Sequence, residues 1–291
     1  MPQRIGITLG DVAGIGPEIA HAALGSDRLT NTAEFVIIGD YPPCHLGEPT
    51  DETARAAAAA LEEAVAAASR AELAGVVTGP IHKARMYNIG FEFPGQTEFF
   101  AARCGVENYA MLLTGGGLSV ALVTTHVPLR DVATHLRKEE IVRVGLLLAT
   151  FLLRRLRRQP RIAVAGLNPH AGESGAMGGE ELELIAPAVE QLNEHAAGSA
   201  IFAGPFSPDT IFYRAVQGEW DGVLCMYHDQ GLIPLKLHAF HEGVNVTLGL
   251  PFPRTSPDHG TAFEIAGKAI ARPDSMIAAL NLAAELAAKA R

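Results

Sequence analysis

Three histidines, His126, His170 and His228, each come shortly after an apolar stretch that is typical of a buried strand. Neutral imidazole is a common ligand of zinc and similar divalent cations, and a catalytic zinc site typically uses three protein ligands and leaves one position open. One such histidine alone is better interpreted as a hydrogen-bonded structural residue, but three in the same context favour a shared cation. The sequence contains no HExxH, so it does not indicate a zincin-type protease.

Basic residues follow apolar runs in the same way. Lys83, Lys236 and Arg254 are of the type that clamps a phosphate or a carboxylate, although each in isolation is better interpreted as a solvated surface charge. His259 lies in a turn-like Asp-His-Gly-Thr-Ala segment and could equally bind a ligand or be structural.

The sequence contains neither of two common nucleotide-binding motifs, the Rossmann fingerprint GxGxxG and the P-loop GxxxxGK[ST]. Ala13–Glu18 opens a helix whose N-terminus could hold an anion, but an ordinary turn between strand and helix is favoured.

Short β-rich runs alternate with longer helical stretches, a pattern typical of an α/β fold with a mostly parallel sheet. The expected strands are residues 5–9, 35–39, 75–78, 110–113, 120–124, 162–165, 223–226 and 244–248. The expected helices are residues 51–73, 139–157, 180–195 and 274–289, with Asp274 or Ser275 as a cap of the last one. Gly115–Gly117 predicts a hairpin turn. Since ligands bind beyond the carboxyl ends of parallel strands, the three histidines are expected near one another.

Composition excludes several classes of protein. The 291 residues are 48% hydrophobic and 19% charged, which excludes a disordered or fibrous chain. The formal charge of −9 and the 6% aromatic content argue against nucleic-acid binding. The most apolar run, 144–153, is too short to span a bilayer, and the N-terminus does not resemble a signal peptide. The cysteines Cys44, Cys104 and Cys225 form no CxxC pair, which predicts a cytoplasmic protein.

Several segments, taken together, resemble the 4-hydroxythreonine-4-phosphate dehydrogenase family of pyridoxal phosphate biosynthesis and its close paralogues. They run in order through nearly the whole chain: GDVAGIGPE (10–18), TGPIHK (78–83), TTHVPLRD (124–131), GLNPHAGE (166–173), MYHDQGL (226–232), VNVTLGLP (244–251) and RTSPDHGTA (254–262). The segment 259–273 also resembles the adenine-side loop of isopropylmalate dehydrogenases.

This resemblance implies an isocitrate/isopropylmalate dehydrogenase-like α/β fold, with two subdomains and an active-site cleft between them. It implies one continuous catalytic unit over 1–291, with a cofactor side (1–95 and 250–291) and a side for metal, substrate and dimer contacts (96–249). It further implies a homodimer whose active site lies near the subunit interface, with no nucleic-acid or membrane partner.

The resemblance also assigns roles to residues. The metal ligands are His126, His170 and His228, and the metal is one divalent ion per site, Zn, Mg or Co. The substrate-binding positions are Gln96, Thr97, Lys236, Asn245 and Arg254. NAD or NADP is expected at His259, Gly260, Thr261, Ala262 and Glu264, and the candidate proton acceptors are Lys83, Asp229 and Asp258. Two features depart from the family: Gln96 stands where a histidine is usual, and the region 40–51 is shorter than usual.

The implied reaction is a metal-dependent oxidation of 4-phosphooxy-L-threonine by NAD(P). The resulting 3-oxo acid loses carbon dioxide to give 3-amino-2-oxopropyl phosphate. Gln96 is uncharged and cannot carry a proton at neutral pH, which keeps two paralogous substrates open: threonate or erythronate 4-phosphate and an aromatic cis-dihydrodiol carboxylate. Two other classes also remain, a hydrolase with three histidines on a metal and a non-catalytic binding module.

Overall fold

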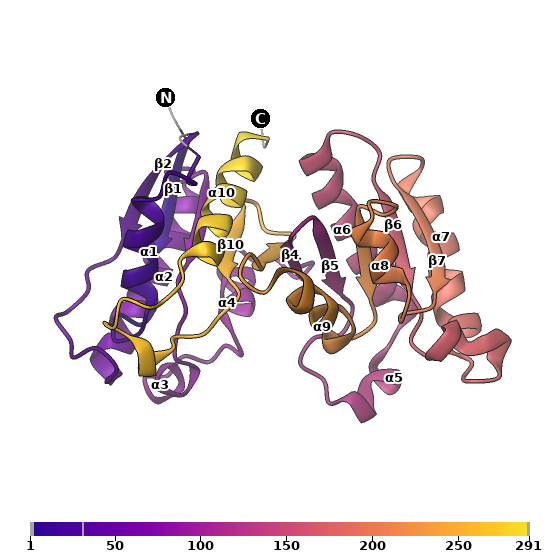
Figure 1. The fold of residues 1–291 in the computed structure, drawn as a ribbon, viewed down its shortest axis with the longest axis horizontal. Coiled ribbons are helices and arrows are strands. Elements are labelled where there is room, and N and C mark those ends of the chain that lie inside the picture. Colours follow the sequence, from indigo (N-terminus) through magenta and orange to yellow (C-terminus); the bar gives the residue numbers. More distant parts are fainter. Residues whose placement is uncertain (1–2, 31, 290–291) are drawn as a thin grey trace. The chain divides into compact units, whose positions relative to one another are not determined.

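The chain folds into two compact units that each contain a sheet and a core. A computed structural model describes residues 3–30 and 32–289, so residues 1–2, 31 and 290–291 of the expected subdomains lie outside the described part. Unit 1 comprises Met1–Glu107 and His241–Arg291, and unit 2 comprises Asn108–Phe240 (Figure 1). Among the described residues, no helix is long and apolar enough to cross a membrane. The expected α/β class is confirmed.

Unit 1 contains a sheet in the order β2-β1-β3-β10-β9, in which only the β10–β9 pair is antiparallel. Its strands are β1 (Gln3–Thr8), β2 (Ala33–Ile38), β3 (Gly75–Thr78), β9 (Val244–Leu248) and β10 (Arg254–Pro257). Its helices are α1 (Gly16–Leu24), α2 (Asp51–Ser69), α3 (Lys83–Asn88), α4 (Gln96–Arg103), η4 (Phe263–Ile265) and α10 (Asp274–Ala288).

The central strand β3 of unit 1 is apolar at successive positions because helices cover the sheet. Every residue of β3 is buried, as expected for parallel strands covered on both faces. The alanine-rich α2 packs on β1, β2 and β3, and its N-terminus is closed by a capping box between Thr50 and Thr53. The helix α10 packs on β10, β3, β1 and β9.

Unit 2 contains a sheet in the order β4-β5-β8-β6-β7, in which only the β4–β5 hairpin is antiparallel. The strands are β4 (Ala110–Gly115), β5 (Leu118–Leu122), β6 (Arg161–Ala165), β7 (Ile201–Phe206) and β8 (Gly222–Cys225). The helices are η1 (Leu129–Asp131), α5 (Val132–His135), α6 (Lys138–Leu156), η2 (Pro169–Gly175), η3 (Glu181–Ile185), α7 (Ala186–Ala196), α8 (Ile211–Val216) and α9 (His228–Ala239). The hairpin turn is confirmed, with positive φ at Gly116 and Gly117.

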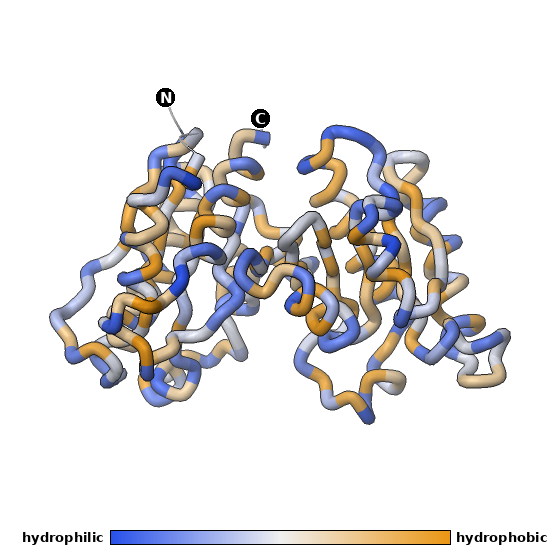
Figure 2. Tube along the Cα trace, viewed as in Figure 1, coloured by the Kyte–Doolittle hydropathy of each residue, from blue (hydrophilic) through white to orange (hydrophobic). Residues whose placement is uncertain are grey.

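Strand alternation decides which helix covers which face of β8. A Cβ built at Gly231 of α9 would lie 3.0 Å from the Cys225 sulfur, so α9 approaches this face closely and glycine is needed there. Leu224, one residue earlier on the strand, lies instead beside α6, where a Cβ at Gly145 would be 3.2 Å from it. Figure 2 shows hydrophobic segments running through the interior of each unit.

Every expected strand and the four expected helices are confirmed, with shifts of a few residues at their ends. The sequence did not predict the strands β7 and β10 or the helices α3, α4, α5, α8 and α9. The sequence Arg-Thr-Ser-Pro of β10 is polar, and α9 contains Gly231 and Pro234, which disfavour a helix in isolation. The expected cap of α10 is wrong. Its N-cap residue is Pro273, while Asp274 pairs with Arg28 and the Ser275 hydroxyl donates to the Gly243 carbonyl.

Candidate active site

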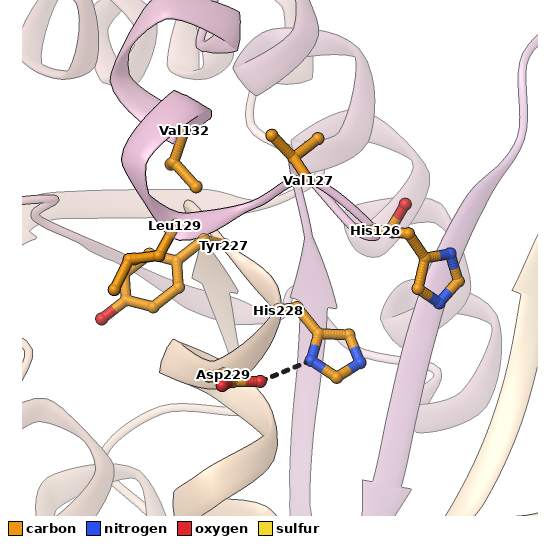
Figure 3. Close-up of a pocket in the computed structure, with 8 residues that line it drawn as sticks. His126, Val127, Leu129, Val132, Tyr227, His228 and Asp229 are labelled. Atoms are coloured by element: carbon orange, nitrogen blue, oxygen red, sulfur yellow. Dashed lines mark hydrogen bonds and ion pairs between the residues drawn. The ribbon is translucent and has the colours of Figure 1, made fainter.

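Two of the three histidines come together at the carboxyl ends of neighbouring parallel strands. β5 and β8 pair in parallel, and the segments that follow them are tied by the Thr124 hydroxyl, which donates to the Met226 carbonyl at 2.8 Å. His126 and His228 follow these two residues, and their ring centroids lie 5.9 Å apart (Figure 3). Hydrogen bonding between the two strand ends therefore sets the spacing of the two imidazoles.

A carboxylate orients one of these rings. The Nδ1 atom of His228 lies 2.7 Å from Oδ1 of Asp229, the next residue in the first turn of α9 (Figure 3). With a carboxylate accepting at Nδ1, a neutral imidazole carries its proton there and offers the Nε2 lone pair to a ligand. Because the His228 side chain is 33% exposed, that ligand can reach it from solvent.

The two histidines line a pocket of about 260 Å³ in unit 2. The other residues that line it are Thr125, Val127, Leu129, Val132, Tyr227 and Asp229. The pocket thus combines two imidazoles and one carboxylate with an apolar wall, which is the donor chemistry that suits a divalent cation.

His170 lies on a different loop of unit 2. It is exposed in η2, beyond the end of β6, and it does not line the pocket. Across residues 3–30 and 32–289 of this single chain, no three His, Cys, Asp or Glu side chains are grouped so as to hold a metal. The donor types therefore fit a divalent cation, whereas the three-histidine site stays a prediction.

Two buried side chains position these loops, and the sequence did not single them out. Gln230 is 6% exposed; its amide nitrogen donates to the Gly166 carbonyl and its oxygen accepts from the Met226 N–H. It thereby joins the loop that carries His228 to the start of the loop that carries His170. Glu181, 2% exposed, accepts hydrogen bonds from this second loop. In the sequence, the only sign of either residue is a polar side chain close to an expected site residue.

A second group of predicted site residues gathers around Arg254 in unit 1. The guanidinium of this β10 residue donates to the hydroxyls of Thr78 and Thr247 and to the amide oxygen of Gln96, which are all neutral acceptors. Within the described chain, its Nε atom is buried without a hydrogen-bond partner. Burial lowers the pKa of Arg254 to about 10, because a cation loses hydration there. A buried cation held by neutral partners is suited to an anionic ligand.

Gln96, the departure from the family pattern, is part of the Arg254 cradle. Its amide nitrogen donates to the Gly79 carbonyl at 3.0 Å, while its oxygen accepts from Arg254 at 2.9 Å. Its neighbour Thr97 contacts the Thr247 hydroxyl at 3.4 Å. Gln96 therefore connects the end of β3 to the arginine and satisfies one guanidinium N–H without adding charge.

The remaining predicted residues have separate environments. Asn245 donates to Asp258 at 3.2 Å, and the Asn245 oxygen is buried without a partner in the described part of the chain. Lys83 is exposed at the start of α3 in unit 1, and Lys236 is half-buried on α9 in unit 2. The structure thus brings Gln96, with Thr97, to Arg254, and Asn245 to Asp258, but it leaves Lys83 outside both groups.

The segment expected to bind the cofactor packs on the turn after β1. The Thr261 carbonyl accepts from the Ile15 N–H at 2.9 Å, and a Cβ at Gly14 would lie 2.5 Å from that carbonyl. The ring of Phe263 meets His82 edge to face at 5.1 Å. The backbone around Gly260, Ala262 and Glu264 is thereby anchored on Ala13–Gly16, which requires glycine at position 14. Whether this segment binds a dinucleotide stays a prediction.

Comparison with known proteins supports the family resemblance. The family model described as pyridoxal phosphate biosynthetic protein PdxA matches residues 16–283. The chain is 42% identical to the 4-hydroxythreonine-4-phosphate dehydrogenase of Caulobacter vibrioides, covering 99% of this chain and 98% of the relative. It is 41% identical to the protein of the same name from Aquifex aeolicus, covering 98% and 99%.

Solved structures agree in fold. The 4-hydroxythreonine-4-phosphate dehydrogenase of Klebsiella pneumoniae superposes with a TM-score of 0.83 at 34% identity, covering 98% of this chain and 99% of the other. A terephthalate 1,2-cis-dihydrodiol dehydrogenase from Burkholderia xenovorans gives a TM-score of 0.70 at 25% identity, covering 98% of each chain. A β-decarboxylating dehydrogenase from Thermococcus kodakarensis, at 17% identity with a TM-score of 0.52, shares the fold.

Proposed function

Because the chain belongs to the family of the pyridoxal phosphate biosynthetic protein PdxA, we propose that it is a 4-hydroxythreonine-4-phosphate dehydrogenase. It oxidises the secondary alcohol of 4-phosphooxy-L-threonine, and the resulting 3-oxo acid loses carbon dioxide to give 3-amino-2-oxopropyl phosphate. The structural observation that carries this proposal is the buried Arg254 cation, whose hydrogen bonds go to neutral oxygens. An anionic substrate group would form charge-assisted hydrogen bonds with this guanidinium, in addition to the electrostatic attraction that Glu98 already exerts on it.

The proposal includes a divalent cation (Zn, Mg or Co) held by His126, His228 and His170. When bound, the cation supplies Lewis-acid polarisation of the substrate alcohol. The pairing of Asp229 with His228 supports a positioning role for Asp229, since it holds the imidazole in the tautomer that leaves Nε2 available. Lys83 and Asp258 are then the proposed proton acceptors, with Asp258 held in place by Asn245.

NAD or NADP belongs to the proposal as the hydride acceptor, at the segment 259–264. Support comes from the anchoring of this segment on the turn after β1. Arg254 and Lys236 would hold the phosphate or the carboxylate of the substrate, and Gln96 would keep the Arg254 fork in place. Thr97 and Asn245 complete the proposed polar contacts.

A homodimer is also proposed, supported by an apolar face on α9. Ile233, Leu237 and Phe240 are 65%, 88% and 68% exposed, and their spacing of four and three residues places them on one side. Large apolar residues grouped on one helical face mark an interaction surface. The same helix begins at His228, so the proposed interface and the proposed cation site share one element. A cytoplasmic location is part of the proposal and is supported by the free thiols of Cys44, Cys104 and Cys225.

A substrate panel tests the proposed activity. The chain is incubated with 4-phosphooxy-L-threonine, threonate 4-phosphate, erythronate 4-phosphate or an aromatic cis-dihydrodiol carboxylate, with NAD or NADP, and with or without a chelator. We expect reduced-nicotinamide absorbance with the first substrate and its loss on chelation. Oxidation of the dihydrodiol, with 4-phosphooxy-L-threonine inert, would favour the reaction named for the Burkholderia xenovorans relative. Product formed without reduced cofactor would indicate a hydrolase.

The metal assignment has its own test. His170→Ala is expected to lose both bound cation and turnover while the protein stays folded, since an exposed loop side chain contributes little to the core. Metal content by elemental analysis and the circular-dichroism spectrum check these outcomes. Full activity in this variant would contradict the assignment.

A further inference from the structure

The loop that carries His170 has an unusual backbone. Six consecutive residues adopt positive φ: His170 at 51°, Ala171 at 52°, Gly172 at 79°, Glu173 at 43°, Ser174 at 57° and Gly175 at 94°. Four of them have side chains, for which the left-handed conformation brings Cβ close to the following carbonyl oxygen. Such a run persists only where surrounding groups over-determine it, and these conformations cluster at functional sites.

Glu181 is the buried group that this loop folds around. Its Oε1 atom accepts from the backbone N–H groups of Leu167 and Asn168, both at 2.7 Å, and its Oε2 atom accepts from the Asn168 side chain at 3.0 Å. These residues lie immediately before the left-handed turn. The carboxylate therefore fixes the direction in which the chain enters that turn.

The middle of the turn packs directly on the same carboxylate. A Cβ built at Gly172 would lie 2.6 Å from Glu181 Oε2, and one built at Gly166 would lie 3.1 Å from Oε1. Glycine at both positions lets the backbone pass over the carboxylate. The Glu181 side chain thus contacts the loop at two places, just before the left-handed residues and at their centre.

The Glu181 contact also links the two histidine loops. Gln230 donates to the Gly166 carbonyl and accepts from the Met226 N–H, so the residue just before the Glu181-bound amides is tied to the segment leading to His228. Displacing the Glu181 carboxylate removes its three hydrogen bonds to Leu167 and Asn168, while Gln230 still holds the Gly166 carbonyl and Glu180 still accepts from the Asn168 side chain. The Glu181 carboxylate does more than fill space in the core, because both of its oxygens accept hydrogen bonds from the loop that carries His170.

We propose that Glu181 is a positioning residue, which holds the left-handed turn 170–174 so that His170 reaches the cation site; this inference rests on the proposed function. The side chain acts through the loop and not by touching the cation or the substrate. It sets how tightly the cation binds and how rigid the loop is before binding.

The test compares Glu181→Gln with Glu183→Gln, an exposed glutamate two residues later. Glutamine keeps the shape but loses the charge, so its oxygen is a weaker acceptor than a carboxylate oxygen, and its NH₂ group faces either the two backbone N–H groups or the Asn168 side chain. We expect hydrogen exchange at the Leu167 and Asn168 amides to accelerate by at least about tenfold in Glu181→Gln alone. Affinity for Co²⁺, titrated alone into metal-free protein, should fall by about 10–100-fold, and saturating Co²⁺ should restore turnover.

The possible results are separable. Unchanged exchange at both amides, or faster exchange with unchanged Co²⁺ affinity, overturns the positioning role and leaves the proposed function standing. Failure of the unaltered protein to bind Co²⁺ overturns the metal part of the proposed function and the inference with it. If Glu181→Gln does not fold, Glu181→Asp keeps the charge on a shorter side chain, and the same exchange and Co²⁺ measurements apply to it. Affinity equal to that of the unaltered protein in this variant then overturns the inference.

Discussion

Arg254 is the residue whose environment says most about its role. The residue is 4% exposed, and the hydrogen bonds of its guanidinium go to two hydroxyls and one amide oxygen. The ring of Phe100 lies 5.6 Å from the guanidinium carbon, so part of the charge faces an aromatic ring. Burying a cation in this way costs stability, and burial lowers the pKa of the group to about 10. This cost, present before any ligand binds, supports the proposal that Arg254 takes an anionic ligand.

Replacing Arg254 by methionine separates binding from stability. We expect the KM of Arg254→Met for the phosphorylated substrate to rise by about 10–100-fold, because a charge-assisted contact is lost. The free energy of unfolding of the ligand-free variant should stay level or rise by about 1 kcal/mol, since a buried cation is replaced by a shorter, unbranched apolar side chain. Steady-state kinetics and urea unfolding measure the two effects.

Inorganic phosphate provides the control for this comparison. It should raise the Tm of the unaltered protein and leave that of Arg254→Met unchanged, because only the former retains the cation. Equal protection of both proteins would place the anion site elsewhere.

Helix ends illustrate how local geometry controls stability in this chain. Helix α7 ends at Ala197, an exposed residue with φ 46° and ψ 40°, whose N–H contacts the Asn193 and Glu194 carbonyls. A left-handed residue at this position satisfies otherwise unpaired carbonyls, and glycine adopts it most readily. Helix α10 has no such local closure at its start, and its first residue, Asp274, pairs instead with Arg28 and Arg272.

The exposed end of α7 predicts a stabilising glycine. Ala197→Gly should raise the free energy of unfolding by about 0.5–1 kcal/mol, because glycine has no Cβ to crowd the left-handed conformation. Ala59→Gly, at an exposed position inside α2, should lower it by about 1 kcal/mol, since there glycine loses more conformational freedom. Chemical denaturation of both variants checks the opposite signs. A loss of stability in both would mean that the left-handed conformation is absent in solution.

Asp274 predicts a pH-dependent contribution at the start of α10. The hydrogen bond from Arg28 is the main reason that the pKa of Asp274 is lowered from its ordinary value of 3.8. A carboxyl group with a lower pKa in the folded state binds fewer protons there than when unfolded. The stabilisation that Asp274 provides is therefore complete above pH 3.8 and is lost as the pH falls through the pKa of the folded state.

The matching experiment compares the unaltered protein with Asp274→Asn. The difference in free energy of unfolding should be largest near neutral pH and should vanish in strong acid. Denaturation curves across an acidic pH series measure it. A difference that grows as pH falls would have the wrong sign for this pair.

Each unit contains five strands and a core of buried apolar residues, and the predicted site residues are divided between the units. The apolar cluster of unit 2 includes Val120, Leu122, Val223, Cys225 and Leu232. Helix α9 contributes to this core through Leu232 and Leu235, while Ile233 and Leu237 remain exposed on the same helix. A helix that is apolar on two sides, with only one side covered by its own chain, fits a subunit interface.

The proposed dimer can be tested on that exposed side. Leu237→Glu should shift the mass measured by light scattering from dimer towards monomer, because a charge would be desolvated in the interface. The circular-dichroism spectrum should not change, since the side chain is 88% exposed in the single chain. Ile270→Glu, 62% exposed on a loop of unit 1, is the matched control and should leave the mass unchanged. A monomeric unaltered protein would refute the dimer.

The apolar periodicity and the motifs of the sequence predicted most of the strands and the family. The apolar runs located eight strands, because buried parallel strands are apolar at successive positions, and the motif blocks identified the family. They could not reveal β10 or α9, whose polar residues, glycine and proline are tolerated only because neighbouring elements cover them.

In the candidate site, too, the sequence predicted some residues and only the folded chain showed their contacts. Residue types and their positions after strands singled out His126, His228 and Arg254. The partners of those residues came only from the folded chain: Asp229 beside His228, Gln96 and Thr247 around Arg254. Glu181 and Gln230 had no signal of their own, because a buried polar residue is recognised by what surrounds it. Hydrogen bonds between segments far apart in the chain depend on strand order and register, which pairwise spacing along one sequence does not encode.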